Sequence, residues 1–266
     1  MDNPAALRRI GRMGKAALLG CAVALGASAS LLLAAPKNAA PEKPGDFEQA
    51  LQVIAQAREA YQAVQDYACT FVKSEVIGGK LQPENAMAMK VKAQPFSVHF
   101  KWQTPKALEG QECCYVTGKH NGVLRGKSPG VLGIVGFVNI SLTDPQVVNS
   151  SRYPITDAGI GNLIDRLAKR WPEEKARQRT VATVRNYEFS GKRCTRVETV
   201  NPNTQPGEFF CYRSVIYFDQ ESKLPIRAEM YDWPKPGSPP GGAFLESYNY
   251  VNLKLNVGLT DKDFAY

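Results

Sequence analysis

The sequence predicts an α+β protein, mainly β, in which a strongly curved antiparallel sheet forms an unclosed half barrel around two or more helices. Three observations support this fold class. Most segments after residue 66 alternate between apolar and polar residues, which is the period of a β-strand. Two segments have the three-to-four-residue spacing of an amphipathic helix. Turn signals join successive strand-like segments, and 266 residues are too many for a simple two-layer meander, so we expect a curled sheet with a hollow.

Residues 1–36 are expected to be a signal peptide or a signal anchor. Four cations, the last of them Lys15, precede a run from Ala16 to Ala35 that contains no charged residue. A basic flank stays in the cytoplasm while the apolar run enters the membrane, so we expect the rest of the chain in the periplasm. Three outcomes stay open: cleavage near Ala35, retention of residues 16–35 as an inner-membrane anchor, and lipidation of Cys21.

A linker and one domain are expected after the export signal. Residues 37–45 combine prolines with small and charged residues, a composition typical of an extended tether. Residues 46–266 are then expected to form a single half-barrel domain, because their number suffices to bury a sizeable core.

Two helices are expected to pack on the sheet. The first covers about residues 47–65, with Asp46 as its capping residue and one apolar face. The second covers about residues 160–171. Asp157 is its candidate cap, and Pro172 is expected to end it because proline lacks the backbone N–H group.

Strand-like alternation occupies most of the remaining sequence. Gly78-Gly79 and Asn121-Gly122 are turn signals that close hairpins. Residues 131–142 form a glycine-containing apolar stretch, for which a strand pair and a mobile flap over an apolar site both stay open. We expect about nine to eleven strands, and the clearest segments are 67–72, 87–91, 96–102, 114–117, 179–189, 193–200, 209–219, 226–233 and 245–255.

The cysteines beyond the export signal suggest disulfide chemistry, because an exported chain meets an oxidising compartment. Cys194 and Cys211 lie on two strand-like segments joined by a turn-rich connection, so we expect them to face each other and form a disulfide. Two buried thiols are the alternative. A pairing of Cys69 with Cys113 or Cys114 also stays open, and it would leave one thiol free. The spacings match no zinc or redox motif, so we expect no metal and no cofactor.

Charge and motif content disfavour two classes of function. The 33 Lys and Arg residues exceed the 25 Asp and Glu residues, but the cations are dispersed, so we expect no nucleic-acid partner. Weak contact with an anionic membrane surface stays open. His99 and His120 are expected to be exposed to solvent, and no serine-hydrolase elbow or phosphate-binding loop is present. The signatures of an enzyme are therefore weak, and we expect no catalytic residues.

Six strings of residues carry a family resemblance. They are Tyr67–Glu75, Pro95–Trp102, Tyr153–Thr156, Tyr217–Asp219, Tyr231–Pro234 and Gly258–Phe264. Through these strings the chain resembles a family of secreted bacterial proteins of unknown function, DUF1571, over roughly residues 47–264. That family's layout is in turn similar to that of the lipoprotein-localisation (Lol-type) carriers. The resemblance implies an unclosed barrel that holds acyl chains under a helical lid, and it carries over no catalytic residues.

A carrier of acyl chains needs an apolar concave face with adaptable side chains. The alternative is that the strand residues of this set simply pack against the first helix, and that residues 131–138 form a buried strand. The residues expected to line the hollow are Met87, Met89, Phe96, Val98, Phe100, Trp102, Ile134 and Phe137.

Three functions follow from these observations. The first is an exported envelope protein that binds a lipid or the acyl chain of an acylated protein, as a carrier or chaperone. The second is a membrane-tethered interaction or sensor module of the same fold. The third is an envelope hydrolase, which predicts carboxylates or a histidine with perturbed pKa values in a polar cleft.

Overall fold

The computed structural model describes residues 47–202 and 208–266. The expected export signal, the expected linker and the expected helix cap Asp46 lie outside these residues. Within them, no helix is both long and apolar enough to cross a membrane.

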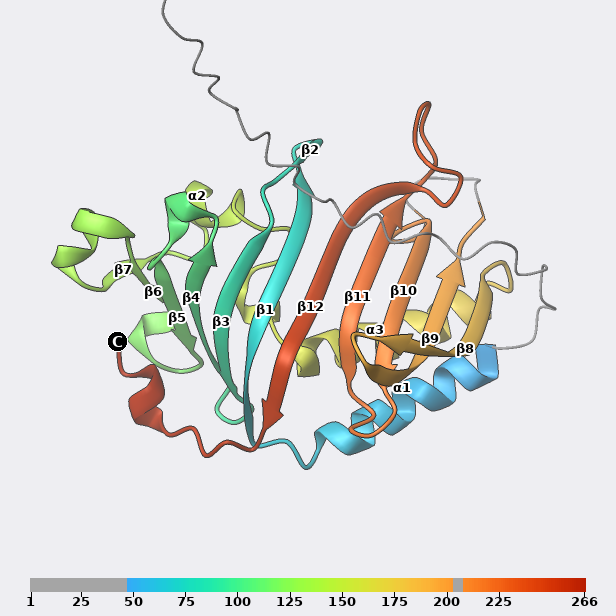
Figure 1. The fold of residues 1–266 in the computed structure, drawn as a ribbon, viewed down its shortest axis with the longest axis horizontal. Helices are drawn as coiled ribbons and strands as arrows, with labels where there is room; N and C mark the ends of the chain where they lie inside the picture. The colour runs from blue at the N-terminus through green and yellow to red at the C-terminus, as the bar shows by residue number, and fades with distance from the viewer. Residues whose placement is uncertain (1–46, 203–207) are drawn as a thin grey trace, which may run out of the picture. The chain divides into compact units, whose positions relative to one another are not determined.

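The described residues form a mainly β fold built on one antiparallel sheet of twelve strands (Figure 1). The strand order is β7-β6-β5-β4-β3-β1-β12-β11-β10-β9-β8, with the short β2 paired to β1. The first long strand therefore pairs with the last one in the middle of the sheet, and β7 and β8 are its edges. The strands are β1 (Asp66–Ile77), β2 (Lys80–Leu81), β3 (Asn85–Lys92), β4 (Ser97–Thr104), β5 (Glu112–Val116), β6 (Leu124–Lys127), β7 (Val138–Ile140), β8 (Val181–Phe189), β9 (Lys192–Val200), β10 (Arg213–Asp219), β11 (Pro225–Asp232) and β12 (Ala243–Leu255).

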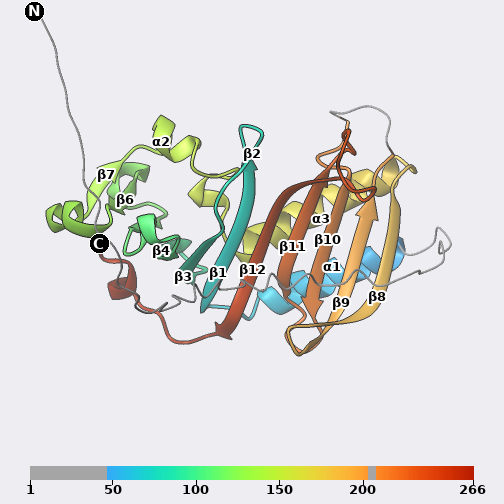
Figure 2. The same cartoon turned by 45° about the horizontal axis from the view of Figure 1, so that its top comes forward.

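Helices α1 (Phe47–Tyr61) and α3 (Ile160–Ala176) cover one face of the β8–β12 half of the sheet (Figure 2). Their apolar stripes are buried against it, as the spacing of three and four residues predicts. The two helices touch where Gly161 faces Tyr61, because a Cβ atom at Gly161 would lie 2.5 Å from the tyrosine ring. Each large apolar side chain buried here stabilises the fold by about 1.5–3 kcal/mol.

Helix α3, which is the second of the two helices expected from the sequence, differs from its prediction at both ends. Its cap is not Asp157, because the backbone N–H of Ile160 donates to the hydroxyl oxygen of Tyr67 on β1 at 2.8 Å. Pro172 does not end it, and the helix continues to Ala176. Proline removes one hydrogen bond of the helix. The helix persists past the proline because Trp171, just before it, is buried and packs on Phe218 of β10 with ring centroids 6.3 Å apart.

The opposite face of the sheet is covered at one end by the C-terminal segment. Phe264, in the short 3₁₀ helix η5 (Asp261–Phe264), packs on Cys114 and Val116. Tyr266 stacks on His99 with ring centroids 4.4 Å apart. The expectation that His99 is exposed is therefore wrong. Burial lowers the pKa of His99, although its Nε2 atom lies 3.0 Å from Glu112 Oε2 and this contact opposes the shift.

The expected disulfide between Cys194 and Cys211 is absent, and all five cysteines of the described residues carry free thiols. Cys194 lies opposite Asp219, whereas Cys211 precedes the start of β10. At about 3.3 Å per residue the two are roughly 26 Å apart along the hairpin, far beyond the ~7 Å limit between bridged Cα atoms. They also belong to clusters on opposite faces of the sheet.

Cys69 is equally unable to reach Cys113 or Cys114. The cross-strand pairs run from Cys69 to Met89, from Met89 to Phe100, and from Phe100 to Cys113. Three strand spacings of about 4.8 Å separate β1 from β5, so the thiols are too distant to bridge.

Glu174 gives a prediction for the pH dependence of stability. Burial raises its pKa to about 7, although a hydrogen bond from Asn201 and the charges of Arg170 and Arg177 oppose the shift, and its Oε2 atom has no hydrogen-bond partner. Between the ordinary glutamate pKa of ~4.3 and this raised value, the folded state binds the proton more tightly. The free energy of unfolding therefore contains a contribution that falls as pH rises through this window.

We expect Glu174→Gln to remove that contribution. Denaturant unfolding at pH 4.5 should give similar stabilities for the variant and the wild type, and at pH 8 the variant should be more stable by on the order of 3 kcal/mol. Glu173→Gln, which changes the exposed neighbour, is the matched control and should follow the wild-type curve. If the free energy of unfolding changed with pH in the same way in Glu174→Gln and in the wild type, the raised pKa of Glu174 would be contradicted.

Candidate functional site

A pocket of about 480 Å³ lies over the β1–β6 half of the sheet, on the same face as the helices. Its floor comes from β1, β3, β4, β5, β6, β7 and β12. Its other wall is residues 145–159, which we call the roof. The roof contains the single-turn helix α2 (Pro145–Val148) and the 3₁₀ helix η4 (Ile155–Asp157). Because α1 and α3 cover the other half of the sheet, this half is left to the roof, which covers it only in part.

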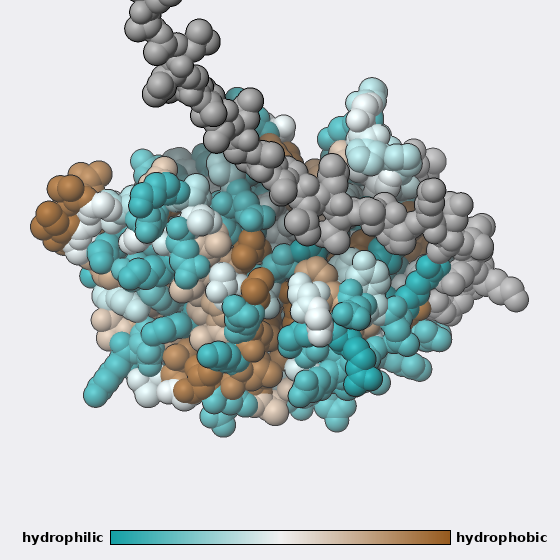
Figure 3. All heavy atoms as spheres, viewed as in Figure 1, coloured by the Kyte–Doolittle hydropathy of each residue, from teal (hydrophilic) through white to brown (hydrophobic). Residues whose placement is uncertain are grey.

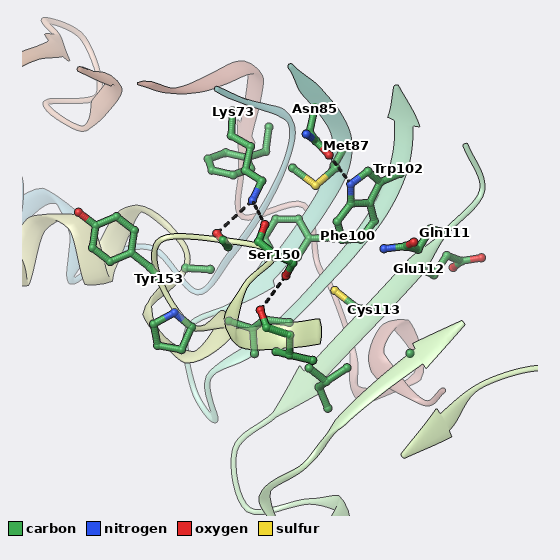
Figure 4. A pocket seen from close by; sticks show the side chains of 18 of the residues that line it. Lys73, Asn85, Met87, Phe100, Trp102, Gln111, Glu112, Cys113, Ser150 and Tyr153 are labelled. Carbon is green, nitrogen blue, oxygen red and sulfur yellow. Dashed lines mark hydrogen bonds between the residues drawn. The ribbon is translucent and has the colours of Figure 1, made fainter. Parts of the chain in front are cut away.

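The floor of the pocket is apolar and aromatic. Met87 from β3 and Phe100 and Trp102 from β4 project into it (Figure 4). Phe71 lies between Phe100 and Tyr248, with ring centroids 5.8 Å from each. The indole N–H of Trp102 is occupied, since it donates to Asn85 Oδ1 at 2.7 Å. These strands present apolar side chains here because their alternation points every second residue at the covered face.

Three of the eight residues predicted to line a hollow line this pocket: Met87, Phe100 and Trp102. Met89 and Val98 point to the same face but are buried in the core beneath the covering elements. Phe96 packs on Tyr115, with ring centroids 6.4 Å apart.

The last two of the eight, in segment 131–138, are not among the lining residues. Ile134 is 84% exposed, and Phe137 packs on Tyr266 with ring centroids 4.7 Å apart. This segment is neither a strand pair nor a flap closed over the pocket. It consists of the 3₁₀ helix η3 (Gly130–Val135) followed by β7.

Sequence reasoning missed the residues that complete the pocket from distant segments. Most of them are apolar residues in irregular or short segments, which periodicity does not place in space, whereas Tyr250 is on the long strand β12. They include Leu124, Val147, Ile155 and Tyr250. Val138 and Ile140 also line the pocket, and they lie in the apolar stretch of residues 131–142 that the sequence did single out.

A polar cluster, which we call the clasp, fastens the roof to the floor. Glu75 of β1 and Glu246 of β12 lie directly opposite each other in the sheet and are 2% and 0% exposed. Glu75 accepts hydrogen bonds from Tyr248 Oη at 2.6 Å and from Lys73 Nζ at 2.8 Å.

The roof supplies the remaining partners of the two carboxylates. Glu75 accepts from Ser151 Oγ at 3.1 Å and from the backbone N–H of Arg152 at 3.3 Å. Glu246 accepts from Tyr153 Oη at 2.7 Å and from the guanidinium of Arg152. Consecutive roof residues thus bind two buried carboxylates, which fixes the roof at this end of the pocket.

The two glutamates differ in electrostatics. Burial opposes ionisation of Glu75, but Lys73 and the hydrogen bonds outweigh it, so the pKa is lowered. Burial dominates at Glu246 and raises the pKa, although Tyr153 and Arg152 oppose the shift. Neither carboxylate is among the pocket-lining residues. Their chemistry is therefore directed at the roof and not at the pocket.

The charged groups of the pocket wall are also paired within the protein. Lys73 bonds Glu75, Lys127 Nζ lies 3.2 Å from Glu112 Oε1, and Arg166 Nη1 lies 3.9 Å from Asp157 Oδ2. In the part of the chain that the structure describes, no group of three or more His, Cys, Asp or Glu side chains is placed to hold a metal ion. The site therefore offers an apolar surface with a neutralised polar border.

Comparison with known proteins gives one family and several solved structures. The model of DUF1571, described as a protein of unknown function, matches residues 64–266. No curated protein sequence matches the chain.

The solved structures similar to this chain include lipoprotein LppX from Mycobacterium tuberculosis, with 13% identity and a TM-score of 0.46 over 80% of this chain and 98% of that one. A LolA superfamily protein from Nitrosomonas europaea has 14% identity and a TM-score of 0.32 over 82% and 97%. An uncharacterized conserved protein from Thermus thermophilus has 9% identity and a TM-score of 0.46 over 82% and 93%. At these scores the likenesses carry no argument about function.

The clasp predicts that Tyr153→Phe loosens the roof. The substitution removes one hydrogen-bond donor from the buried Glu246, which costs about 1–3 kcal/mol. Amide hydrogen exchange in residues 145–158 should become faster, while exchange in α1 and α3 should stay close to wild type.

Tyr187→Phe is the matched control, because it removes a hydroxyl from a tyrosine on the edge strand β8 that is 41% exposed. It should leave exchange in the roof unchanged. Unchanged roof exchange in Tyr153→Phe would show that the clasp does not hold the roof.

Proposed function

The chain belongs to the DUF1571 family, and for this member we propose a role as an exported envelope protein that holds the acyl chain of a lipid or of an acylated protein, as a carrier or chaperone. In this proposal the sheet acts as an unclosed half barrel, and the pocket beneath the roof is its hollow. The protein acts in the periplasm, either free or anchored to the inner membrane by residues 16–35, and it catalyses no reaction.

The pocket is the observation that carries this proposal. Its volume of about 480 Å³ lies within the ~300–1,000 Å³ typical of small-molecule sites. Met87, Phe100 and Trp102 form an apolar floor, and methionine adapts to flexible chains. An acyl chain gains free energy in such a site because each buried CH₂ group contributes about 0.8 kcal/mol.

The polar border supports an apolar ligand over a charged one. The three cations of the lining are already paired with carboxylates, so a charged ligand would have to displace an existing ion pair. An acyl chain needs no such partner.

The hydrolase alternative gains no support from the clasp. Glu75 and Glu246 do have perturbed pKa values. Their oxygens accept hydrogen bonds from Tyr248, Arg152 and Tyr153. Neither carboxylate is among the residues that line the pocket.

Filling the pocket should weaken the binding of an acyl chain. Val147 lies on the lining, and the next residue, Val148, is 56% exposed and lies off it. Val147→Trp should weaken binding of a fluorescent fatty acid about tenfold or more, because overpacking costs roughly 1–3 kcal/mol.

Val148→Trp is the matched control and should bind within about twofold of wild type, since exposed substitutions change free energies by only ~0.5 kcal/mol. Fluorescence titration measures both. Equal binding by the two variants would place the ligand elsewhere, and no binding by the wild type would refute the proposal.

A further inference from the structure

The 3₁₀ helix η3 carries a concentrated apolar surface that contributes nothing to the pocket. Four of its side chains are 75–84% exposed: Val131, Leu132, Ile134 and Val135. We call residues 130–136 the apolar tip. It forms the brown projection at the left of Figure 3, beside β7 in Figure 1. Other exposed large apolar residues in the described part of the chain are not gathered so closely in the sequence.

The tip has a defined backbone conformation. Gly133 packs so closely that a Cβ atom there would lie 2.6 Å from the carbonyl oxygen of Ser128. Gly136 has a φ of +81°, which favours glycine, and its N–H donates to Gly133 O at 3.0 Å. The glycines therefore form a tight projection in which the aliphatic side chains stay in water. Such exposed apolar clusters mark sites of association with a membrane or a protein.

The charge around the tip favours a membrane. Residues 113–143 contain Lys119, Arg125 and Lys127 but no aspartate or glutamate. Lys119 and Lys127 pair with Asp261 and Glu112 of other segments. Arg125 donates to Tyr266 O and to Asn139 Oδ1. An apolar projection with cationic flanks complements a bilayer that contains anionic headgroups.

The tip is continuous with the pocket. Lys127 and Ser128 just before it and Val138 just after it line the pocket. A bilayer that received the tip would therefore lie beside the border of the pocket. The uncharged run of residues 16–35, which lies outside the described residues, is a second apolar segment that would keep a retained chain at the same membrane.

We propose that the apolar tip inserts into an anionic bilayer and docks the protein on it with the pocket border facing the membrane. Aliphatic side chains that are exposed in water then lie among acyl chains, and Arg125 lies at the level of the headgroups. This docking does not depend on the ligand of the pocket, so it stands or falls separately from the proposed carrier function.

Tryptophan quenching at the tip tests insertion directly. Ile134→Trp and the control Val181→Trp, on the exposed edge strand β8, are mixed as full exported protein with vesicles of phosphatidylcholine and phosphatidylglycerol that carry brominated acyl chains. The signal added by each substitution is measured against wild type.

We expect strong quenching at position 134, little at 181, and less quenching at 134 in vesicles without phosphatidylglycerol. This comparison is unaffected by a retained anchor, which would bring both variants to the membrane. Absent or equal quenching at 134 would overturn the proposal.

A second variant separates docking from ligand binding and from self-association. The double variant Leu132→Ser/Ile134→Ser should bind vesicles more weakly than the wild type, because it lacks the contribution of the tip. It should still bind the fluorescent fatty acid as the wild type does. Val181→Ser/Tyr187→Ser is the matched control on β8 and should change neither property. A wild type that is dimeric without vesicles and becomes monomeric in the tip variant would show a contact between copies and overturn membrane docking. A wild type whose tip inserts into vesicles but which binds no fatty acid would contradict the carrier function and leave docking intact.

Discussion

The opposed pair Glu75 and Glu246 is the constraint on which the rest of the site depends. Two carboxylates directly across from each other on the central strands β1 and β12, both almost fully buried, would be strongly unfavourable without partners. Lys73 and Tyr248 supply part of the compensation from the sheet, and residues 151–153 supply the rest. Because the carboxylates need these partners, they hold the roof over the sheet, and the roof is what makes a pocket of an otherwise open sheet face.

The position of the pocket follows from how the two halves of the sheet are covered. The helices α1 and α3 bury the β8–β12 half with continuous apolar stripes and leave a packed core there. The other half is covered by the roof, whose helices are a single turn of α-helix and a short 3₁₀ helix. Such a segment has too few large side chains to fill the space above Phe71, Met87 and Phe100. The apolar pocket is therefore a consequence of a short cover on a wide sheet, and the clasp keeps that cover from collapsing or leaving.

Local periodicity predicted the elements well, because it depends on neighbours in the sequence. The alternation around Met87, Phe100 and Trp102 placed these side chains on one face of the sheet, and in the structure they lie on one side of the pocket. The clasp could not be found in this way, since Arg152 and Glu246 are 94 residues apart and their contact is a product of tertiary structure. Cys194 and Cys211 were wrongly paired because hairpin register sets their separation and sequence alone does not fix it. His99 was misplaced because its cover, Tyr266, comes from the far end of the chain. Pro172 shows the same effect, since tertiary burial outweighed a local helix stop.

The most direct measurement of the central claim is native mass spectrometry, followed by organic extraction, of the protein purified from an exporting host without detergent. A stoichiometric adduct that moves into organic solvent and has the mass of a phospholipid or an acylated peptide is the predicted result. The fraction of protein that carries the adduct should be lower in Val147→Trp and close to the wild-type fraction in Val148→Trp. A wild-type protein that is empty, and that stays empty after incubation with phospholipid vesicles, would contradict the claim that the pocket holds an acyl chain.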